Sequence, residues 1–168
     1  RLLLPAVLCC SQMTAQSLYT MTSPLSDGST TGVRMPNGMI EHAYHRAAML
    51  VDGASLRLLP AGTNITRLGF VLSKGAGAKV SGTLTVYLSN TPTTVRDLNM
   101  VWSVITAGMT RVYSGPFIIP DTTGSIEVVL SAPFQYTGMS MYVAYEFQSA
   151  GPFTVQNAVF ASNITLSM

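Results

Sequence analysis

The sequence predicts an all-β fold, and within that class an antiparallel β-sandwich. The clearest observation is the stretch 82–90, in which apolar and polar side chains alternate strictly. A period of two is typical of a strand with one face on an apolar core and the other in water. Several later segments repeat this period, with Gly, Pro and Asn between them. Short strands separated by turn residues favour a sandwich, with a barrel as the nearer rival, and the lack of crossover helices excludes a parallel sheet.

The composition supports the same class. Charged residues make up 10% of the chain, against about 25% in ordinary globular domains, and Ser, Thr and Gly are plentiful instead. The 168 residues suffice for one domain without metals or disulfides, because chains of about 150 residues bury roughly 70% of their unfolded surface. The formal net charge of +2 comes from scattered basic residues, so we expect no nucleic-acid partner.

Residues 1–16 predict the back half of a secretory signal peptide, with its start missing. Arg1 is followed by an apolar run to Cys10 and by the small-residue exit Thr14–Gln16. The run is shorter than the roughly 20 residues that a membrane-spanning helix needs. We therefore expect a secreted or cell-surface protein with no membrane span in the mature chain; a buried N-terminal strand or helix is the alternative.

Both cysteines, Cys9 and Cys10, lie inside this leader. Lipid attachment is a minor alternative, because Leu8 rather than a small residue precedes Cys9. The mature chain would then hold no disulfide and no thiolate chemistry.

Residues 17–38 predict an extended N-terminal arm or edge strand, and residues 39–168 the sandwich domain. The expected strands cover residues 44–51, 63–72, 82–90, 110–114, 125–130 and 141–147, with one or two more over 155–160 and 164–166. A helix is the alternative for the first of these strands. A turn at Asp52-Gly53 and a short helical turn over 54–59 follow it.

The segments between the expected strands predict turns, a helical turn and a hairpin. The Gly-rich loop 73–79 joins two alternating segments and predicts that they pair as a hairpin. One helical turn is expected over 95–99. Gly115-Pro116 predicts a strand break, and Pro133 with Thr137-Gly138 predicts a turn around Phe134 and Tyr136.

Several sequence motifs follow one another in a fixed order along the chain: Ile65–Phe70, Leu84–Thr91, Trp102, Val112–Gly115, Val128–Tyr136 with Gly138, and Met141–Tyr145. In this order they resemble a module of exported Bacteroidota proteins that is associated with type IX secretion. The resemblance covers roughly residues 43–160. It implies a jelly-roll-like sandwich that acts in adhesion, in carbohydrate or protein binding, or as a spacer, and it brings no catalytic motif. Because no sorting domain precedes Met168, we expect further domains of a longer polypeptide.

Aromatic side chains are the candidate ligand-binding residues. Tyr87, Tyr142, Tyr113 and Trp102 could stack against sugar rings if they share one exposed face, because an aromatic ring offers an apolar platform. Tyr87 and Tyr142 fall on the outward register of their strands. The apolar neighbours of Trp102 favour a core position for it instead. The expected partners are a glycan or a surface protein.

Catalytic and metal sites find little support. His42 and His45 would share a face only on a helix, and a metal site there also needs a third ligand. Asp27-Gly28 and Asp121–Gly124 offer one carboxylate per loop, which favours ordinary turns over calcium sites. The chain has no G-x-S-x-G motif, and the loop 74–79 lacks a phosphate-binding ending.

We therefore expect no catalytic residue, no metal and no cofactor. The predicted function is a non-catalytic secreted or cell-surface module for binding, adhesion or spacing. The alternative is a carbohydrate-binding accessory domain of a secreted hydrolase or protease.

Overall fold

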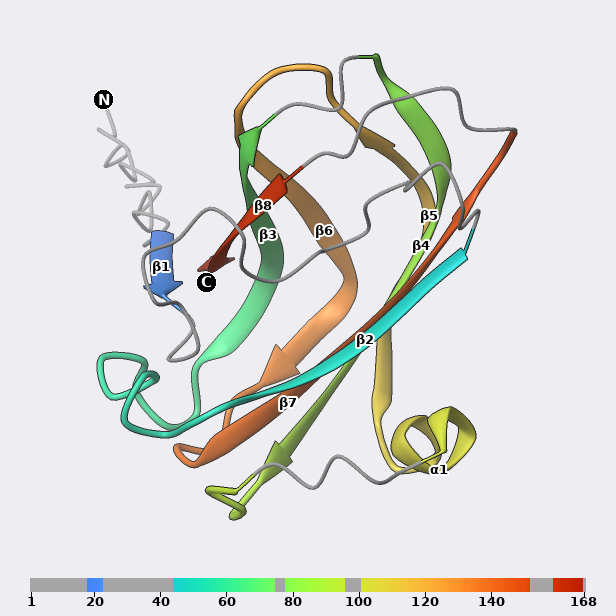
Figure 1. The fold of residues 1–168 in the computed structure, drawn as a ribbon. Helices are drawn as coiled ribbons and strands as arrows, with labels where there is room; N and C mark the ends of the chain where they lie inside the picture. Colours follow the sequence, from blue (N-terminus) through green and yellow to red (C-terminus); the bar gives the residue numbers. More distant parts are fainter. Residues whose placement is uncertain (1–17, 23–43, 75–77, 96–100, 152–158, 168) are drawn as a thin grey trace, which may run out of the picture.

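Two four-stranded antiparallel sheets pack face to face in a computed structural model of the chain (Figure 1). The structure describes residues 18–22, 44–74, 78–95, 101–151 and 159–167. The elements of these residues are β1 (Leu18–Thr22), β2 (Tyr44–Val51), β3 (Asn64–Lys74), β4 (Val80–Thr91), α1 (Trp102–Ala107), β5 (Thr110–Ile119), β6 (Gly124–Gln135), β7 (Ser140–Ser149) and β8 (Val159–Ser167). The predicted antiparallel β-sandwich is confirmed.

The strand order is that of a jelly roll. One sheet has the order β1-β8-β3-β6 and the other β2-β7-β4-β5. The pairs β1–β8, β2–β7, β3–β6 and β4–β5 are nested, so that each strand pairs with the one equally far from the opposite end of the series. The pairs β3–β8 and β4–β7 complete the two sheets. This nesting is the double Greek-key arrangement of jelly rolls, so the jelly-roll-like architecture is also confirmed.

The core lies between the sheets, on the faces that the alternation predicts. Leu84, Val86 and Leu88 of β4 are fully buried. Across the core, Phe70 of β3 meets Tyr145 of β7 edge to face, with 5.8 Å between ring centroids. Fully burying such a side chain contributes about 1.5–3 kcal/mol. The apolar faces of the strands therefore hold the two layers together.

The predicted segment 44–51 is a strand, β2, and not a helix. The turn after it closes with helical spacing, because the Leu56 amide donates to the Asp52 carbonyl at 3.2 Å. The Asp52 carboxylate also accepts a hydrogen bond from the Ser55 amide at 2.6 Å. The predicted strand, turn and helical turn are thus confirmed in that order.

The predicted hairpin between β3 and β4 is wrong. β3 pairs with β6 and β8, and β4 pairs with β5 and β7, so the connection between them crosses from one sheet to the other. A hairpin would put the two apolar faces on the same side of one sheet. The crossing lets those faces pack against each other, and local alternation is compatible with either arrangement.

One predicted interruption is wrong and another is right only in part, and both involve proline. β5 continues through Gly115 and Pro116. β6 extends past Pro133 to Gln135, but its pairing with β3 shifts register between Val129 and Phe134, and the predicted turn follows at Gly138, which has a positive φ. β5 and β6 are each the last strand of their sheet. Proline lacks an amide donor but is tolerated on an edge strand, where one side of the backbone needs no partner.

The remaining predictions fall partly outside the described residues. Leu18–Thr22 forms the edge strand β1 within the predicted arm, whereas residues 1–16 lie outside the description. The same holds for most of the helical turn expected over 95–99, and α1 begins at Trp102. None of the helices in the described residues has the length and apolar character to cross a membrane.

Candidate binding surface

The outer face of the β2-β7-β4-β5 sheet places charged and aromatic residues side by side. Register aligns Arg46 of β2 with Glu146 of β7, and Glu146 with Thr85 of β4. Tyr87 lies one outward position farther along β4 and pairs with Ala144. Because side chains alternate along a strand, all of these residues point away from the core.

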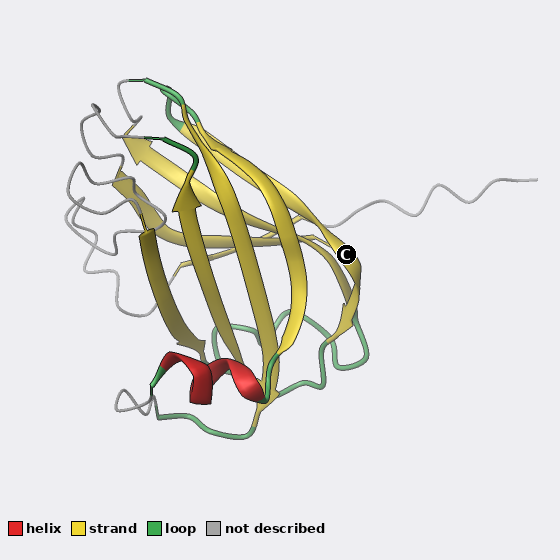
Figure 2. Cartoon of the chain, turned by 90° about the vertical axis from the view of Figure 1, so that its right-hand side faces the viewer, coloured by secondary structure: helices red, strands yellow, loops and turns green. Residues whose placement is uncertain are grey.

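Helix α1 brings Trp102 onto this face. Figure 2 shows the helix lying across one end of the sheet. The indole ring meets the ring of Tyr87 edge to face, with centroids 6.3 Å apart and an interplanar angle of 83°. Such pairs contribute about 0.5–1.5 kcal/mol beyond the burial of their area.

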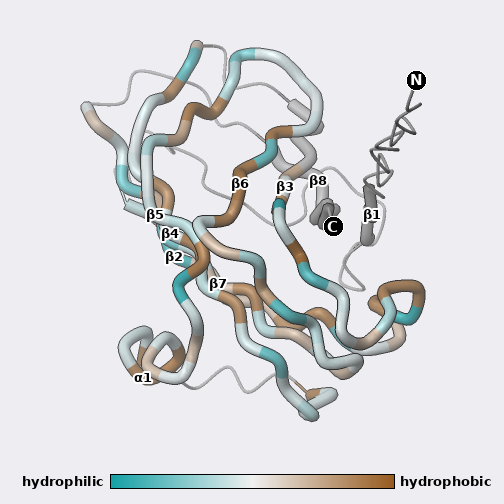
Figure 3. Tube along the Cα trace, turned by 180° about the vertical axis from the view of Figure 1, so that it is seen from behind, coloured by the Kyte–Doolittle hydropathy of each residue, from teal (hydrophilic) through white to brown (hydrophobic). Residues whose placement is uncertain are grey.

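The predicted core position of Trp102 is wrong. The side chain is half-buried on the outer face, and α1 has no buried residue. Its neighbours Val101 and Val104 are 68% and 59% exposed, and Figure 3 shows hydrophobic residues along this helix. A run of apolar residues indicated a core segment, but the helix has only the outer face of one sheet to pack on.

Arg46 connects the aromatic rings. Its guanidinium carbon lies 4.5 Å from the ring centroid of Tyr44 and 5.3 Å from that of Trp102. A cation over an aromatic face contributes about 0.5–1 kcal/mol at exposed sites and more where water is excluded. Arg46 therefore holds strand β2 and helix α1 to one shared cluster.

Glu146 fixes the polar side of the cluster through one oxygen atom. Its Oε2 accepts a hydrogen bond from the Tyr44 hydroxyl at 2.7 Å and from Arg46 Nε at 3.1 Å. Hydrogen bonds to an ionised group are about twice as strong as neutral ones. We call Tyr44, Arg46, Tyr87, Trp102 and Glu146 the aromatic face.

The tyrosines of the aromatic face keep their protons. Burial raises the pKa of Tyr44 above its ordinary value of 10.0, and the Glu146 carboxylate raises it further, against the effect of Arg46. Burial also raises the pKa of Tyr87, as does Glu146, while Arg111 and Arg46 oppose the rise. Both hydroxyls therefore remain hydrogen-bond donors at neutral pH.

Small residues make room beneath the cluster. Ala144 is fully buried although its register directs it outward, and Thr85 is 8% exposed. The Thr85 and Ser114 hydroxyls lie 3.1 Å apart, within hydrogen-bonding distance. The aromatic face is therefore a packed layer over the sheet, with Tyr44 still 39% exposed at its rim.

The four candidate ligand-binding residues predicted from the sequence do not all lie together in the structure. Tyr87 and Trp102 are in contact, and Tyr142 lies on the same outer face, half-buried and aligned with Ser89. Tyr113 instead packs against the core, and its hydroxyl donates to the Pro116 carbonyl at 2.6 Å. It therefore lies apart from the aromatic face.

Sequence reasoning missed three members of the face: Tyr44, Arg46 and Glu146. The signal was present for the strands, because alternation over 44–51 and 141–147 directs all three residues outward. What it lacked was the pairing of β2 with β7, which joins residues about 100 positions apart in the chain.

The histidine and calcium sites, which the sequence left as minor alternatives, have no counterpart among the described residues. His45 lies in strand β2, so the helix that would align it with His42 does not form over Tyr44–Val51. His42 and the Asp27-Gly28 pair lie outside the description. Among the described residues, no group of three His, Cys, Asp or Glu side chains is placed to hold a metal ion.

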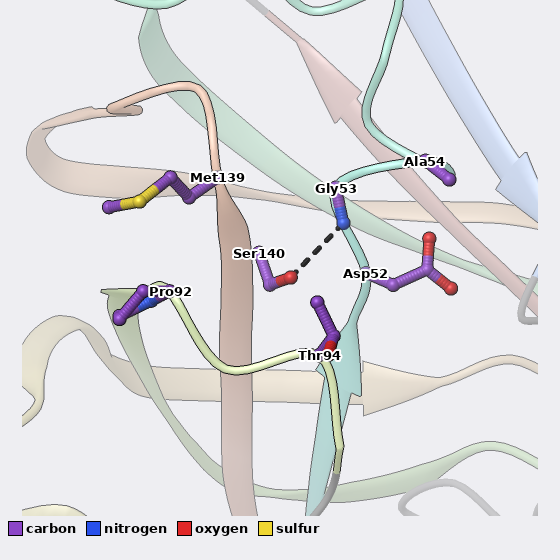
Figure 4. Close-up of a pocket in the computed structure, with 7 residues that line it drawn as sticks. All are labelled: Asp52, Gly53, Ala54, Pro92, Thr94, Met139 and Ser140. Atoms are coloured by element: carbon purple, nitrogen blue, oxygen red, sulfur yellow. Dashed lines mark hydrogen bonds between the residues drawn. The ribbon is translucent and has the colours of Figure 1, made fainter.

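An open pocket of about 500 Å³ lies where loops meet at the end of the sandwich (Figure 4). Its lining residues are Asp52, Gly53, Ala54, Pro92, Thr94, Met139 and Ser140. The Gly53 amide donates to the Ser140 hydroxyl at 3.1 Å, which joins the loop after β2 to the start of β7. These polar groups tie the loops to one another, so the pocket is secondary to the aromatic face as a candidate site.

Comparison with known proteins finds no matching protein-family model and no match among curated proteins. The resemblance to exported Bacteroidota modules therefore stays a prediction from the sequence.

Proposed function

We propose that this chain is a non-catalytic binding module that holds a carbohydrate on the aromatic face. The observation that supports this most is the contact between Trp102, Tyr87 and the Arg46 guanidinium on an outer sheet face. A sugar ring has an apolar C–H side and a hydroxyl rim, and a cluster of rings beside charged groups offers partners for both.

Different residues of the surface would contact the apolar side and the hydroxyl groups of the sugar. Tyr87 and Trp102 provide ring surface, and the exposed Val101 and Val104 extend it along α1. The Tyr44 hydroxyl and the Arg46 guanidinium lie at the polar side, already oriented by Glu146. Groups held in place before binding lose less entropy when the ligand arrives, which favours affinity.

The proposed setting is outside the cell. The leader-like residues 1–16 support secretion or display on the cell surface, and the resemblance to exported modules supports a part in adhesion or spacing. The alternative is an accessory domain that brings a secreted hydrolase or protease to its substrate. Both settings use the same binding surface.

Trp102 makes the proposal directly testable, because it is the only tryptophan of the chain. A glycan array identifies ligands, and titration of the indole fluorescence then reports on the site itself. We expect binding to shift the emission and to protect the indole from a soluble quencher.

Tyr87→Ala should weaken this binding by about tenfold, since losing an aromatic contact costs roughly 1 kcal/mol or more. The matched control is Val129→Ala, which removes an exposed side chain on the opposite sheet. The proposal fails if the array shows no ligand, or if Tyr87→Ala binds as tightly as the control.

A further inference from the structure

A second arginine lies beside the aromatic face. Arg111 of β5 is the cross-strand partner of Tyr87. Its neighbour Val112 is buried in the core, so Arg111 points outward, and it is exposed. Arg46 approaches the cluster from the other side, over the ring of Trp102. Two guanidinium groups thus flank the pair formed by Tyr87 and Trp102.

Both arginines influence the acidity of Tyr87. Burial and the Glu146 carboxylate raise the pKa of Tyr87, while Arg111 and, to a smaller extent, Arg46 oppose that rise. This agrees with the strand order β2-β7-β4-β5, in which Tyr87 on β4 lies between Arg46 on β2 and Arg111 on β5 on the outer face of the sheet.

The positive charge of the two arginines is only partly balanced. The Glu146 carboxylate accepts a hydrogen bond from Arg46 Nε and forms an ion pair with it. The Arg111 side chain forms neither an ion pair nor a hydrogen bond with the residues described. Two guanidinium groups against one carboxylate leave a net charge of +1 on the surface.

Arg46 also adds positive charge to the ring surface that a ligand would meet. Its guanidinium lies over the faces of both Tyr44 and Trp102, so part of the aromatic surface presents a cation rather than a bare ring. Guanidinium is planar and weakly hydrated, and its parallel N–H groups match the two oxygens of a carboxylate. A ligand with an acid group on a sugar ring satisfies both the rings and the charges.

We propose that the ligand is an acidic polysaccharide, whose sugar-ring carboxylate lies between Arg46 and Arg111 while the ring itself packs on Tyr87 and Trp102. The inference rests on the proposed carbohydrate-binding function and adds the chemical class of the sugar. Among the described residues of this face, the uncompensated positive charge lies at these two arginines beside one aromatic pair, which suits carboxylates spaced along a glycan chain.

The test compares glycans that differ in the carboxylate alone. Polygalacturonate and alginate carry free carboxylates, and the methyl ester of each keeps its sugar backbone but masks the charge. We expect the chain to bind at least one of the two acidic glycans about tenfold or more tightly than its ester, because a charge-assisted pair is lost on esterification. Added salt should weaken only the acidic complex.

Arg111→Gln isolates the contribution of the second cation. We expect it to weaken binding of the acidic glycan by about tenfold while leaving binding of the ester unchanged. Arg67→Gln is the matched control, because Arg67 is a half-exposed arginine paired with Glu127 on the opposite sheet. Thermal unfolding of both variants verifies that each remains folded.

The outcomes separate this inference from the proposed function. If the esters bind as tightly as the acids, or a sulfated glycan binds more tightly than either acid, the inference is wrong. If the acidic glycans fail to bind while a neutral glycan binds through Tyr87, the inference is again wrong but the carbohydrate-binding function stands. If no glycan binds, both proposals fall.

Discussion

Among the described residues, the outer face of each sheet carries one arginine–glutamate pair, but the neighbours of those pairs differ. Arg46 Nε and Glu146 Oε2 lie 3.1 Å apart, and Arg67 Nη1 and Glu127 Oε2 lie 3.7 Å apart on the other sheet. The arginine side chains are 45% and 39% exposed, and the glutamates 23% and 29%. Since exposure is so similar, the distinction comes from what surrounds each pair.

Around Arg46 and Glu146 are two aromatic rings and a tyrosine hydroxyl that shares the carboxylate. Around Arg67 and Glu127, the outward side chains described in β3 and β6 include no aromatic ring, and Val129 there is 58% exposed. An exposed ion pair alone contributes about 0–1 kcal/mol. The comparison shows that the aromatic neighbours, rather than the ion pair, make one face a candidate binding surface.

The largest expected effect comes from disturbing the sheet that carries the aromatic face. In Gly82→Ala, the new Cβ would clash with the Gln148 carbonyl oxygen and with the Phe147 ring. Because β4 and β7 would have to separate locally, we expect a loss of about 1–3 kcal/mol in the free energy of unfolding, measured by urea denaturation.

Gly151→Ala is the control for this substitution. No heavy atom outside its chain neighbours lies within 4 Å of the Cβ built there, so we expect a change below about 0.5 kcal/mol. Equal losses in the two variants would contradict the close approach of β4 and β7.

Removing the indole tests the binding difference between the two faces. We expect Trp102→Ala to weaken glycan binding by about tenfold, because the ring contacts with Tyr87 and Arg46 are lost together. Isothermal titration calorimetry gives the affinity without the fluorescent probe. Val129→Ala on the other face should bind like the unmodified chain, and a comparable loss there would remove the distinction.

Double-mutant cycles measure the two ion pairs directly. We expect a coupling energy of about 1 kcal/mol between Arg46 and Glu146, because the Tyr44 hydroxyl and the rings order both partners. For Arg67 and Glu127 we expect less than about 0.5 kcal/mol. Urea denaturation of the single and double alanine variants provides both numbers, and equal couplings would contradict the role given to the neighbours.

The smallest effect concerns the ionisation of tyrosine. Glu146 helps to raise the pKa of Tyr44 and Tyr87, whereas burial alone raises the pKa of Tyr136. In Glu146→Gln, the first two pKa values should fall and that of Tyr136 should not change. Site-resolved NMR titration of the tyrosine rings measures all three, and a matching fall at Tyr136 would count against a local effect of the carboxylate.

The same shifts predict how stability depends on pH. At pH 10.0 the unfolded chain has lost about half of these tyrosine protons, whereas the folded chain, with its raised pKa values, still holds most of them. Proton loss therefore favours the unfolded state, and stability should be complete below pH 10.0 and decline above it. Tyr44→Phe and Tyr87→Phe should each reduce this decline, measured by urea denaturation across the alkaline range.

The sequence predicted strands and their buried faces better than it predicted the partners of those strands. Alternation placed Leu84, Val86 and Leu88 in the core correctly, because the period of a strand is local information. The β3–β4 hairpin was wrong, because a short Gly-rich connection fits a crossing between sheets as well as a turn within one. Pro116 was misread for a similar reason, since only the sheet order reveals that β5 is an edge.

Only part of the candidate site could be predicted from the sequence, and for the same reason. Tyr87 was recognised from its outward register, but the position of Trp102 depends on how α1 packs on the sheet. Arg46 and Glu146 become partners only through the β2–β7 pairing, which joins distant parts of the chain. Long-range pairing is thus the missing information in each case.

Chemical-shift mapping by NMR during titration with the tightest-binding glycan tests the central claim most directly. We predict that the ligand shifts the signals of Tyr44, Arg46, Tyr87, Trp102 and Arg111, and leaves those of Arg67, Glu127 and Val129 in place. Shifts confined to the β3–β6 face, or to the loop pocket around Asp52, would contradict the assignment of the aromatic face as the binding surface.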